Sequence, residues 1–230
     1  MNKLYLLMIL SLFYTSNAVA AFSLNSTRYV YIEGNKSIAV QISNDDKKTF
    51  GGQIWIDNIH TDPSDVAFIV SPSFFKINGG LKQVARIMNV SNKLAKDQES
   101  IFWLNVLEIP PKSEKEVNNA LQFAVNTKVK LIYRPKSIAN SRLDAEKNLT
   151  YSVDYKGSVV LKNTTPYIFA VTSVNAGETK LNLNDDIMKK LSIFMPNDEI
   201  NLGKINNKNI SIDSINDFGA QNNYKLNKNE

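Results

Sequence analysis

Histidine and cysteine, the side chains most often used in nucleophilic catalysis and metal binding, are nearly absent from this chain. His60 is its only histidine, and it has no cysteine. A triad with a histidine base, a multi-histidine metal site, a thiolate site and a disulfide are therefore all excluded. His60 lies in the polar stretch 57–64, where we expect an exposed loop residue. We expect no metal and no cofactor.

Paired carboxylates are the other familiar route to catalysis. Asp45-Asp46 and Asp185-Asp186 are adjacent in turn-like sequence, and solvated turn residues explain them better than acid/base chemistry. The chain carries 27 basic and 22 acidic residues. Its lysines are scattered, without the basic stripe and interleaved aromatics of a nucleic-acid surface. The sequence therefore indicates neither an enzyme nor a nucleic-acid-binding protein.

Residues 1–20 are predicted to be a secretory signal peptide. Lys3 supplies the positive start, residues 4–14 the apolar segment, and Ala18-Val19-Ala20 a small-residue cleavage site. The alternative is a retained membrane anchor, but the apolar run is too short to span a bilayer comfortably. We expect the mature chain to begin at Ala21.

The elements that position any site are predicted to be β-strands. From residue 22 to 133, short runs rich in Val, Ile, Phe and Tyr alternate with Asn, Asp, Gly and Pro. Seven such runs predict an immunoglobulin-like sandwich. The expected strands are 24–32, 36–43, 52–57, 66–70, 82–90, 101–108 and 119–133.

A second, smaller sandwich is expected after the polar stretch 136–149, which places the domains at 21–137 and 138–230. A helical period appears only around 187–194, in a short run. The tail from Asn222 is polar and expected to be loosely ordered. The strands expected here are 150–154, 157–162, 167–174, 179–182, 191–195 and 209–214. The fold class is therefore all-β, with two immunoglobulin-like domains.

The segment LAKDQESIFWLNVLEIPP, residues 94–111, carries the most specific signal. It resembles the signature of the periplasmic chaperones of the chaperone/usher pilus pathway, which runs through an acidic-polar turn, an aromatic strand, an asparagine and Ile-Pro-Pro. Two features depart from that family: Gln98 replaces a common arginine, and the second domain lacks the disulfide of many relatives. Further similar segments are 27–44, 53–58, 121–135, 163–174 and 215–220.

The resemblance implies a chaperone of the periplasm whose two domains meet at an angle. Such a chaperone folds, caps and delivers pilus subunits to an outer-membrane usher, and it uses no nucleotide. Subunits lack one strand, and the chaperone lends them the last strand of its first domain. The short segment 111–121 resembles the subgroup with a short loop before that strand. Whether the free protein caps this strand by self-association stays open.

Leu121, Phe123 and Val125 are the predicted donor residues. A period of two places them on one strand face, and burial in a subunit groove would contribute roughly 1.5 to 3 kcal/mol each. The alternative is that they fill the chaperone's own core.

Arg28 and Lys130 match the two basic cleft residues that, in the resembling family, anchor the terminal carboxylate of the subunit. Charge-assisted hydrogen bonds of this kind are strong when water is partly excluded. Strict alternation puts Lys130 on the face opposite to Phe123. Either a bulge or a strong twist between Asn126 and Val129 resolves this, or the cleft and the donor residues use different faces.

Glu99, Arg134 and Asp217 match the interdomain charge cluster of the family. A planar guanidinium can satisfy two carboxylates and would thereby fix the angle between the domains. Surface ion pairs contribute little free energy, so we expect this cluster to act on geometry more than on stability.

Two other classes of protein compete with the chaperone hypothesis. An exported structural adhesin or pilus subunit would also be immunoglobulin-like, but such subunits usually carry one incomplete domain. A secreted hydrolase is disfavoured by the lone histidine and the missing nucleophile motif.

Overall fold

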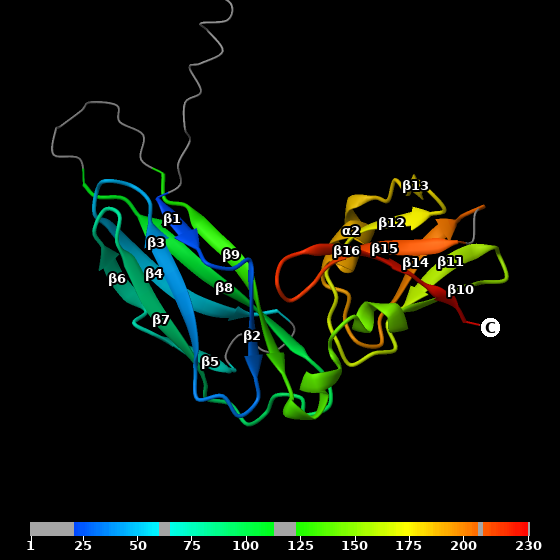
Figure 1. Cartoon of the computed structure of the whole chain (residues 1–230), viewed down its shortest axis with the longest axis horizontal. Coiled ribbons are helices and arrows are strands. Elements are labelled where there is room, and N and C mark those ends of the chain that lie inside the picture. The colour runs from blue at the N-terminus through cyan, green and yellow to red at the C-terminus, as the bar shows by residue number, and fades with distance from the viewer. Residues whose placement is uncertain (1–20, 60–64, 113–122, 207–208, 230) are drawn as a thin grey trace, which may run out of the picture.

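The computed structural model describes residues 21–59, 65–112, 123–206 and 209–229, which form two β-sandwich domains set at an angle (Figure 1). Strands β1 to β9 make up the first domain, and β10 to β17 with helix α2 make up the second. Two short 3-10 helices, η1 (Lys136–Ser141) and η2 (Ala145–Asn148), connect them. The predicted signal peptide, His60 and Leu121 lie outside the described residues.

The first domain consists of two facing sheets. One has the strand order β1-β3-β7-β5 and the other the order β2-β9-β8-β4-β6. Among the described strands of these two sheets, β2 and β9 pair in parallel, and all the other neighbouring strands pair antiparallel. The strands are β1 (Phe22–Leu24), β2 (Arg28–Ile32), β3 (Ile38–Asn44), β4 (Phe50–Asn58), β5 (Phe68–Ser71), β6 (Phe74–Ile77), β7 (Lys82–Asn89), β8 (Ser100–Ile109) and β9 (Asn126–Arg134).

The core of the first domain follows from alternation along these strands. Phe102, Leu104 and Val106 of β8 point inward and are buried. They meet the inward side chains of β3, Val40 and Ile42, across the sandwich. Because successive side chains point to opposite faces of a strand, the intervening residues of β8 face away from this core.

Several first-domain predictions need correction. The single strand expected at 24–32 is two strands, because Ser26 Oγ donates to Arg28 O at 2.6 Å in a local turn. Strand β1 then pairs with β3, whereas β2 pairs with β9 in the other sheet. Strand β6 was missed, and β9 begins at Asn126, so 123–125 are not part of a strand. Nine strands, rather than seven, lie in the described part of this domain.

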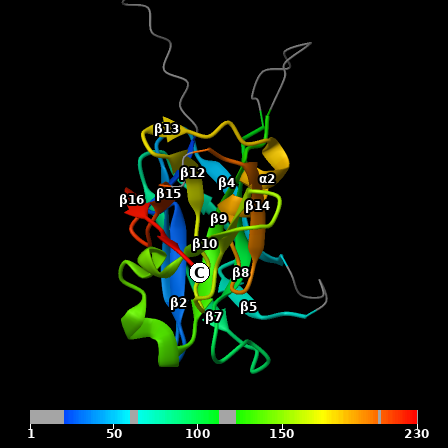
Figure 2. The same cartoon turned by 90° about the vertical axis from the view of Figure 1, so that its right-hand side faces the viewer.

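The second domain also has two sheets, of orders β14-β11-β10-β17 and β13-β12-β15-β16, which Figure 2 shows from their free end. A separate buried cluster fills the space between them. The elements are β10 (Thr150–Val153), β11 (Ser158–Lys162), β12 (Val171–Ala176), β13 (Thr179–Lys180), α2 (Asp185–Ser192), β14 (Glu199–Lys204), β15 (Ile210–Ile215), β16 (Gln221–Lys225) and β17 (Asn227–Lys228).

Helix α2 replaces the strand predicted at 191–195. Asn184 caps it by accepting a hydrogen bond from Ile187 N at 2.9 Å, which satisfies one of the free N–H groups of the first turn. Leu191 is buried against the core. Of the predicted strand, only an isolated bridge between Phe169 and Phe194 remains.

The tail prediction is wrong as well. Strand β16 pairs with β15 over its whole length, and β17 pairs in parallel with β10. Tyr224 and Leu226 are buried in the core. The tail is therefore part of both sheets, although its sequence is polar. The structure also contains β14, which the sequence pattern did not predict.

Candidate functional site

The three residues of the predicted interdomain cluster, Glu99, Arg134 and Asp217, lie in direct contact. Arg134 Nε is 2.6 Å from Glu99 Oε1, and its Nη1 and Nη2 are 2.8 and 3.1 Å from the two carboxylate oxygens of Asp217. Glu99 directly precedes β8, Arg134 is the last residue of β9, and Asp217 lies in the turn between β15 and β16. One guanidinium thus joins an acid of each domain.

Glu99 and Arg134 of this cluster are buried and Asp217 is partly buried, contrary to the expectation of a surface pair. The side chains of Glu99 and Arg134 are 0% and 6% exposed. Glu99 also accepts a hydrogen bond from Ile168 N of the second domain at 2.7 Å. Burial would raise the pKa of Asp217, but the hydrogen bond and charge of Arg134 outweigh it, so that this pKa is lowered. A buried, hydrogen-bonded cluster bears on stability as well as on geometry.

A second buried ion pair, missed from the sequence, extends the cluster. Arg142 Nη1 and Nη2 each lie 2.9 Å from an oxygen of Glu146. The Arg142 guanidinium also stacks over the rings of Tyr167 and Phe169, 5.6 and 5.0 Å from their centroids, and its Nε is 3.9 Å from Asp217. The i,i+4 spacing of this pair is visible in the sequence, but the sequence pattern predicts only a polar domain boundary for the stretch 136–149.

An apolar seam lies beside the charged cluster. Ile101 and Ile132, on the outward faces of β8 and β9, are buried against Ile168 of the second domain. Ile59, Ile193 and Met195 pack around them. Residues on the face opposite to a strand's own core are usually exposed, so the burial of these isoleucines shows that the two domains share an interface.

Arg28 and Lys130 are neighbours on the parallel strands β2 and β9, directly opposite each other in the register. Arg28 is buried and donates from Nη1 to Ile215 O at 2.8 Å. Lys130 is half-buried and donates from Nζ to Ser192 O. Arg28 Nε is buried and has no hydrogen-bond partner among the described residues. The structure therefore brings the two predicted cations together between the domains.

The environment of this pair weakens the protonated form of the lysine. Burial, followed by the positive charge of Arg28, lowers the pKa of Lys130 to about 8. Burial also lowers the pKa of Arg28, although the charge of Asp217 opposes this shift. Two adjacent, partly desolvated cations are suited to bind an anion, because an anion relieves both the repulsion and the lost hydration.

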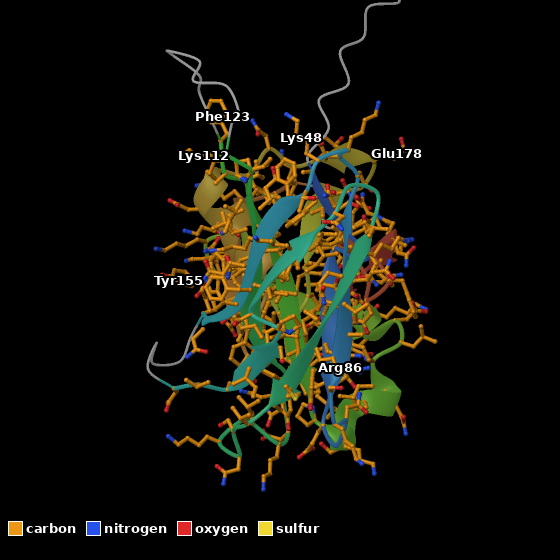
Figure 3. The ribbon with its side chains drawn as sticks, turned by 90° about the vertical axis from the view of Figure 1, so that its left-hand side faces the viewer. Lys48, Arg86, Lys112, Phe123, Tyr155 and Glu178 are labelled. Carbon is orange, nitrogen blue, oxygen red and sulfur yellow. The ribbon has the colours of Figure 1, made fainter. Side chains whose placement is uncertain are left out.

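Phe123 and Val125, two of the predicted donor residues, do not belong to the core of the first domain. They are 73% and 43% exposed, and Figure 3 shows Phe123 at one end of the molecule, near Lys112. Glu108 N donates to Val125 O at 2.9 Å, so the segment stays attached to β8 at this point. For these two residues, the alternative of an own-core role is wrong.

Strand β9 has an open edge ahead of Lys130. Its pairing with β8 runs from Asn126 to Tyr133, whereas β2 begins to pair only at Lys130. In the described residues, the half from Asn126 to Val129 therefore has a sheet neighbour on one side only. The register with β8 is continuous, which excludes a bulge in this pairing. The alternatives of a strong twist, and of different faces for the cleft and donor residues, are left.

Asn105, the asparagine of the signature segment, fastens the start of this edge. It is 0% exposed although it lies on the outward face of β8. Its Nδ2 donates to Asp57 Oδ2 on β4 at 2.9 Å, and its Oδ1 accepts from Asn126 Nδ2 on β9 at 3.2 Å. One side-chain amide thus connects β4, β8 and β9 at Asn126, the residue where β9 begins.

The described residues contain no group of three or more His, Cys, Asp or Glu that could hold a metal ion. None of the helices in the described segments is long and apolar enough to cross a membrane.

Two family descriptions match nearly all of the chain after residue 20. Residues 21–139 match "Pili and flagellar-assembly chaperone, PapD N-terminal domain", and residues 144–226 match "Pili assembly chaperone PapD, C-terminal domain". The predicted domain boundary after residue 137 lies within η1, close to the end of the first match.

Similar proteins are chaperones of fimbriae. The chaperone protein FanE of Escherichia coli is 43% identical over 98% of both chains, and FaeE of the same species is 37% identical over 92% of this chain and 81% of its own. The crystal structure of the periplasmic chaperone SfaE is 28% identical with a TM-score of 0.71, covering 89% of this chain and 98% of SfaE. The SafB chaperone of Salmonella enterica, solved with the SafA pilin, has a TM-score of 0.75 at 21% identity, covering 92% and 98%. The predicted all-β fold with two immunoglobulin-like domains is confirmed.

Proposed function

Since this chain belongs to the PapD family of pilus assembly chaperones, which are not enzymes, we propose that it captures pilus subunits by lending them a strand from the edge of β9. The observation that carries this proposal is the open edge ahead of Lys130, with two exposed apolar side chains before it and two cations at its end. An unpaired strand edge is a template for a further strand.

The proposal also implies a direction for the added strand. If the terminal carboxylate of a subunit binds Arg28 and Lys130 and its last strand runs along 123–129, that strand is parallel to β9. Strand β2 is parallel to β9 too. The subunit strand would therefore lie end to end with β2 and would meet Arg28 at the first residue of that strand.

The subunit lacks one strand, which leaves a groove in its sandwich. Leu121, Phe123 and Val125 are proposed to fill that groove. Phe123 and Val125 are exposed in the free protein, so their burial would occur only in the complex. Each buried apolar side chain of this size contributes roughly 1.5 to 3 kcal/mol. The hydrogen bonds of the added strand supply affinity without regard to sequence, whereas these side chains supply the fit.

The setting of this activity forms part of the proposal. Residues 1–20 would export the chain to the periplasm, where subunits emerge unfolded, and the loaded chaperone would pass them to an outer-membrane usher. The exposed donor residues could also be covered by a second copy of the chaperone while no subunit is bound. The separately solved complexes of SafB with SafA and of CsuC with CsuE are chaperone–subunit complexes of similar proteins.

Phe123→Glu tests the donor segment. Because Phe123 is exposed, the glutamate would be solvated in the free protein, and its melting temperature should stay close to that of the wild type. In the complex the charge would enter an apolar groove. Subunit capture should therefore weaken by more than about tenfold, which corresponds to about 1.4 kcal/mol.

Tyr155→Glu is the matched control, since Tyr155 is an exposed aromatic residue in the turn between β10 and β11 of the second domain, and Figure 3 shows it apart from Phe123. Circular dichroism melting gives the stability of both variants, and pull-down of a fimbrial subunit gives capture. A folded Phe123→Glu protein that captures subunits as well as Tyr155→Glu does would contradict the donor assignment.

A further inference from the structure

Arg28 and Lys130 are both hydrogen-bonded to the main chain of the second domain. Arg28 Nη1 donates to Ile215 O at 2.8 Å, and Lys130 Nζ donates to Ser192 O. Ile215 is the last residue of β15, and Ser192 is the last residue of α2. Two separate elements of the second domain therefore reach two side chains of the first.

These contacts offset an unfavourable arrangement. Arg28 and Lys130 are like charges on adjacent strands, and each is partly removed from water. A carbonyl oxygen carries partial negative charge, and Ser192 O lies at the C-terminal end of α2, which is the negative end of the helix dipole. The two carbonyls therefore stabilise both cations, and fix where they lie, before any ligand is present.

We infer that the second domain positions the carboxylate anchor: the carbonyl groups of Ser192 and Ile215 orient Lys130 and Arg28 for the subunit terminus. This inference rests on the proposed function. An ammonium has three N–H donors and a guanidinium has five, so each cation can keep its carbonyl and still bind a carboxylate. Because donors held in place need not be ordered during binding, the anchor is at full strength only while the domains keep their angle.

The charged cluster and the anchor share one turn, residues 215–220. Asp217, held by Arg134, lies two residues after Ile215. Gly219 of the same turn has a positive φ of 85°, and a Cβ atom there would lie 3.2 Å from Thr27 Oγ1, beside Arg28. A disturbance of this turn should therefore reach Arg28 through Ile215.

The test compares two forms of a fimbrial subunit that the wild-type protein captures, one with a free terminal carboxylate and one with a terminal amide. The wild type should prefer the carboxylate by at least about tenfold. Asp217→Asn releases the turn from Arg134, and Gly219→Ala strains the same turn without changing any charge. Both should reduce the preference to about threefold or less, while binding of the amide form stays within about twofold of the wild type.

Electrostatics and positioning predict opposite signs for Asp217→Asn. Removing a negative charge near Arg28 should, by Coulomb attraction alone, strengthen binding of a carboxylate. A weakened preference therefore identifies lost orientation. Glu146→Gln removes a negative charge from the same cluster, but Glu146 lies in η2 and contacts Arg142 rather than the turn. This control should keep the preference.

Three outcomes would overturn the inference: an unchanged preference in Asp217→Asn, an unchanged preference in Gly219→Ala, or an equal loss in Glu146→Gln. If Asp217→Asn does not fold, Gly219→Ala decides alone, because it removes no charged group. A wild-type protein that captures subunits but shows no carboxylate preference would refute the anchor itself. A wild-type protein that captures no subunit would refute the proposed function.

Discussion

Replacing Arg134 with alanine would leave Glu99 as an unpaired carboxylate in a fully buried position. In the native protein, Glu99 accepts hydrogen bonds from Arg134 and from Ile168 N. The variant would keep only the second of these. Asp217, which is 24% exposed, would lose both of its short contacts to Arg134 but could regain water. The cost should therefore come mainly from Glu99.

The magnitude follows from burial. Removing one partner of a buried ion pair costs about 3 to 5 kcal/mol, and in a chain of this size that corresponds to a fall in melting temperature of about 6 to 20 °C. Burial already raises the pKa of Glu99 in the native protein, and the charge of Arg134 opposes this shift. Without Arg134 the pKa would rise further above its unfolded value. The folded state would then bind the additional proton, so the loss of stability should be larger at about pH 7.5 than at about pH 5.

Thermal and urea unfolding measure this effect. Lys93→Ala is the control, because it breaks an ion pair of similar length whose side chains are 73% and 51% exposed, and such pairs are worth less than about 1 kcal/mol. Adding Glu99→Gln to Arg134→Ala should restore part of the stability by removing the unpaired charge. The reasoning fails if Arg134→Ala costs no more than Lys93→Ala, or if its cost does not change with pH.

Three further predictions concern the edge and the cleft. Subunit capture should weaken as the pH rises from about 7 to about 9, because Lys130, with a pKa of about 8, loses its proton there; binding by Lys130→Arg should stay constant over that range, and a wild type that also stays constant would refute the charged role. Asn105→Ala should cost about 1 to 3 kcal/mol and speed hydrogen exchange in 123–129, whereas unchanged exchange would show that Asn105 does not fasten this edge. N-terminal sequencing of the exported protein should begin at Ala21, and recovery of an intact Met1 form from the membrane would contradict cleavage.

Strand alternation gave most of the fold because it acts locally. Strands β3, β4 and β8 alternate clearly, and their predicted positions agree with the structure to within two residues. The divided first strand depends on a side-chain bond of Ser26, which no periodicity records. Strands β16 and β17 owe their pairing to β15 and β10, so the polar sequence of the tail gave no signal.

Helix α2 could have been predicted. Asn184 precedes two acidic residues, and Lys189 and Lys190 occupy the last turn, which is the usual arrangement of a capped helix. Asp185-Asp186 was instead assigned to a turn because an acidic pair occurs in both settings. The short helical period at 187–194 was the signal that distinguished them.

The residues of the site came from a family resemblance, because their contacts join distant parts of the chain. Arg134 lies 35 residues from Glu99 and 83 from Asp217. A single sequence gives no physical reason to place them together, and it does not show whether an ion pair is buried. This is why the cluster was expected to contribute little to stability, and why the apolar seam and Arg142 were missed.

Strand β9 shows where periodicity stops being informative. Leu131 and Tyr133 have the same alternation as Phe123 and Val125, yet the first two are buried in the core and the second two are exposed. The difference lies in what surrounds each part, because β2 covers the edge only from Lys130 onward. A pattern of period two states which side chains share a face, but it does not state whether the protein itself covers that face. In the proposed function, the captured subunit covers this exposed continuation of the core pattern.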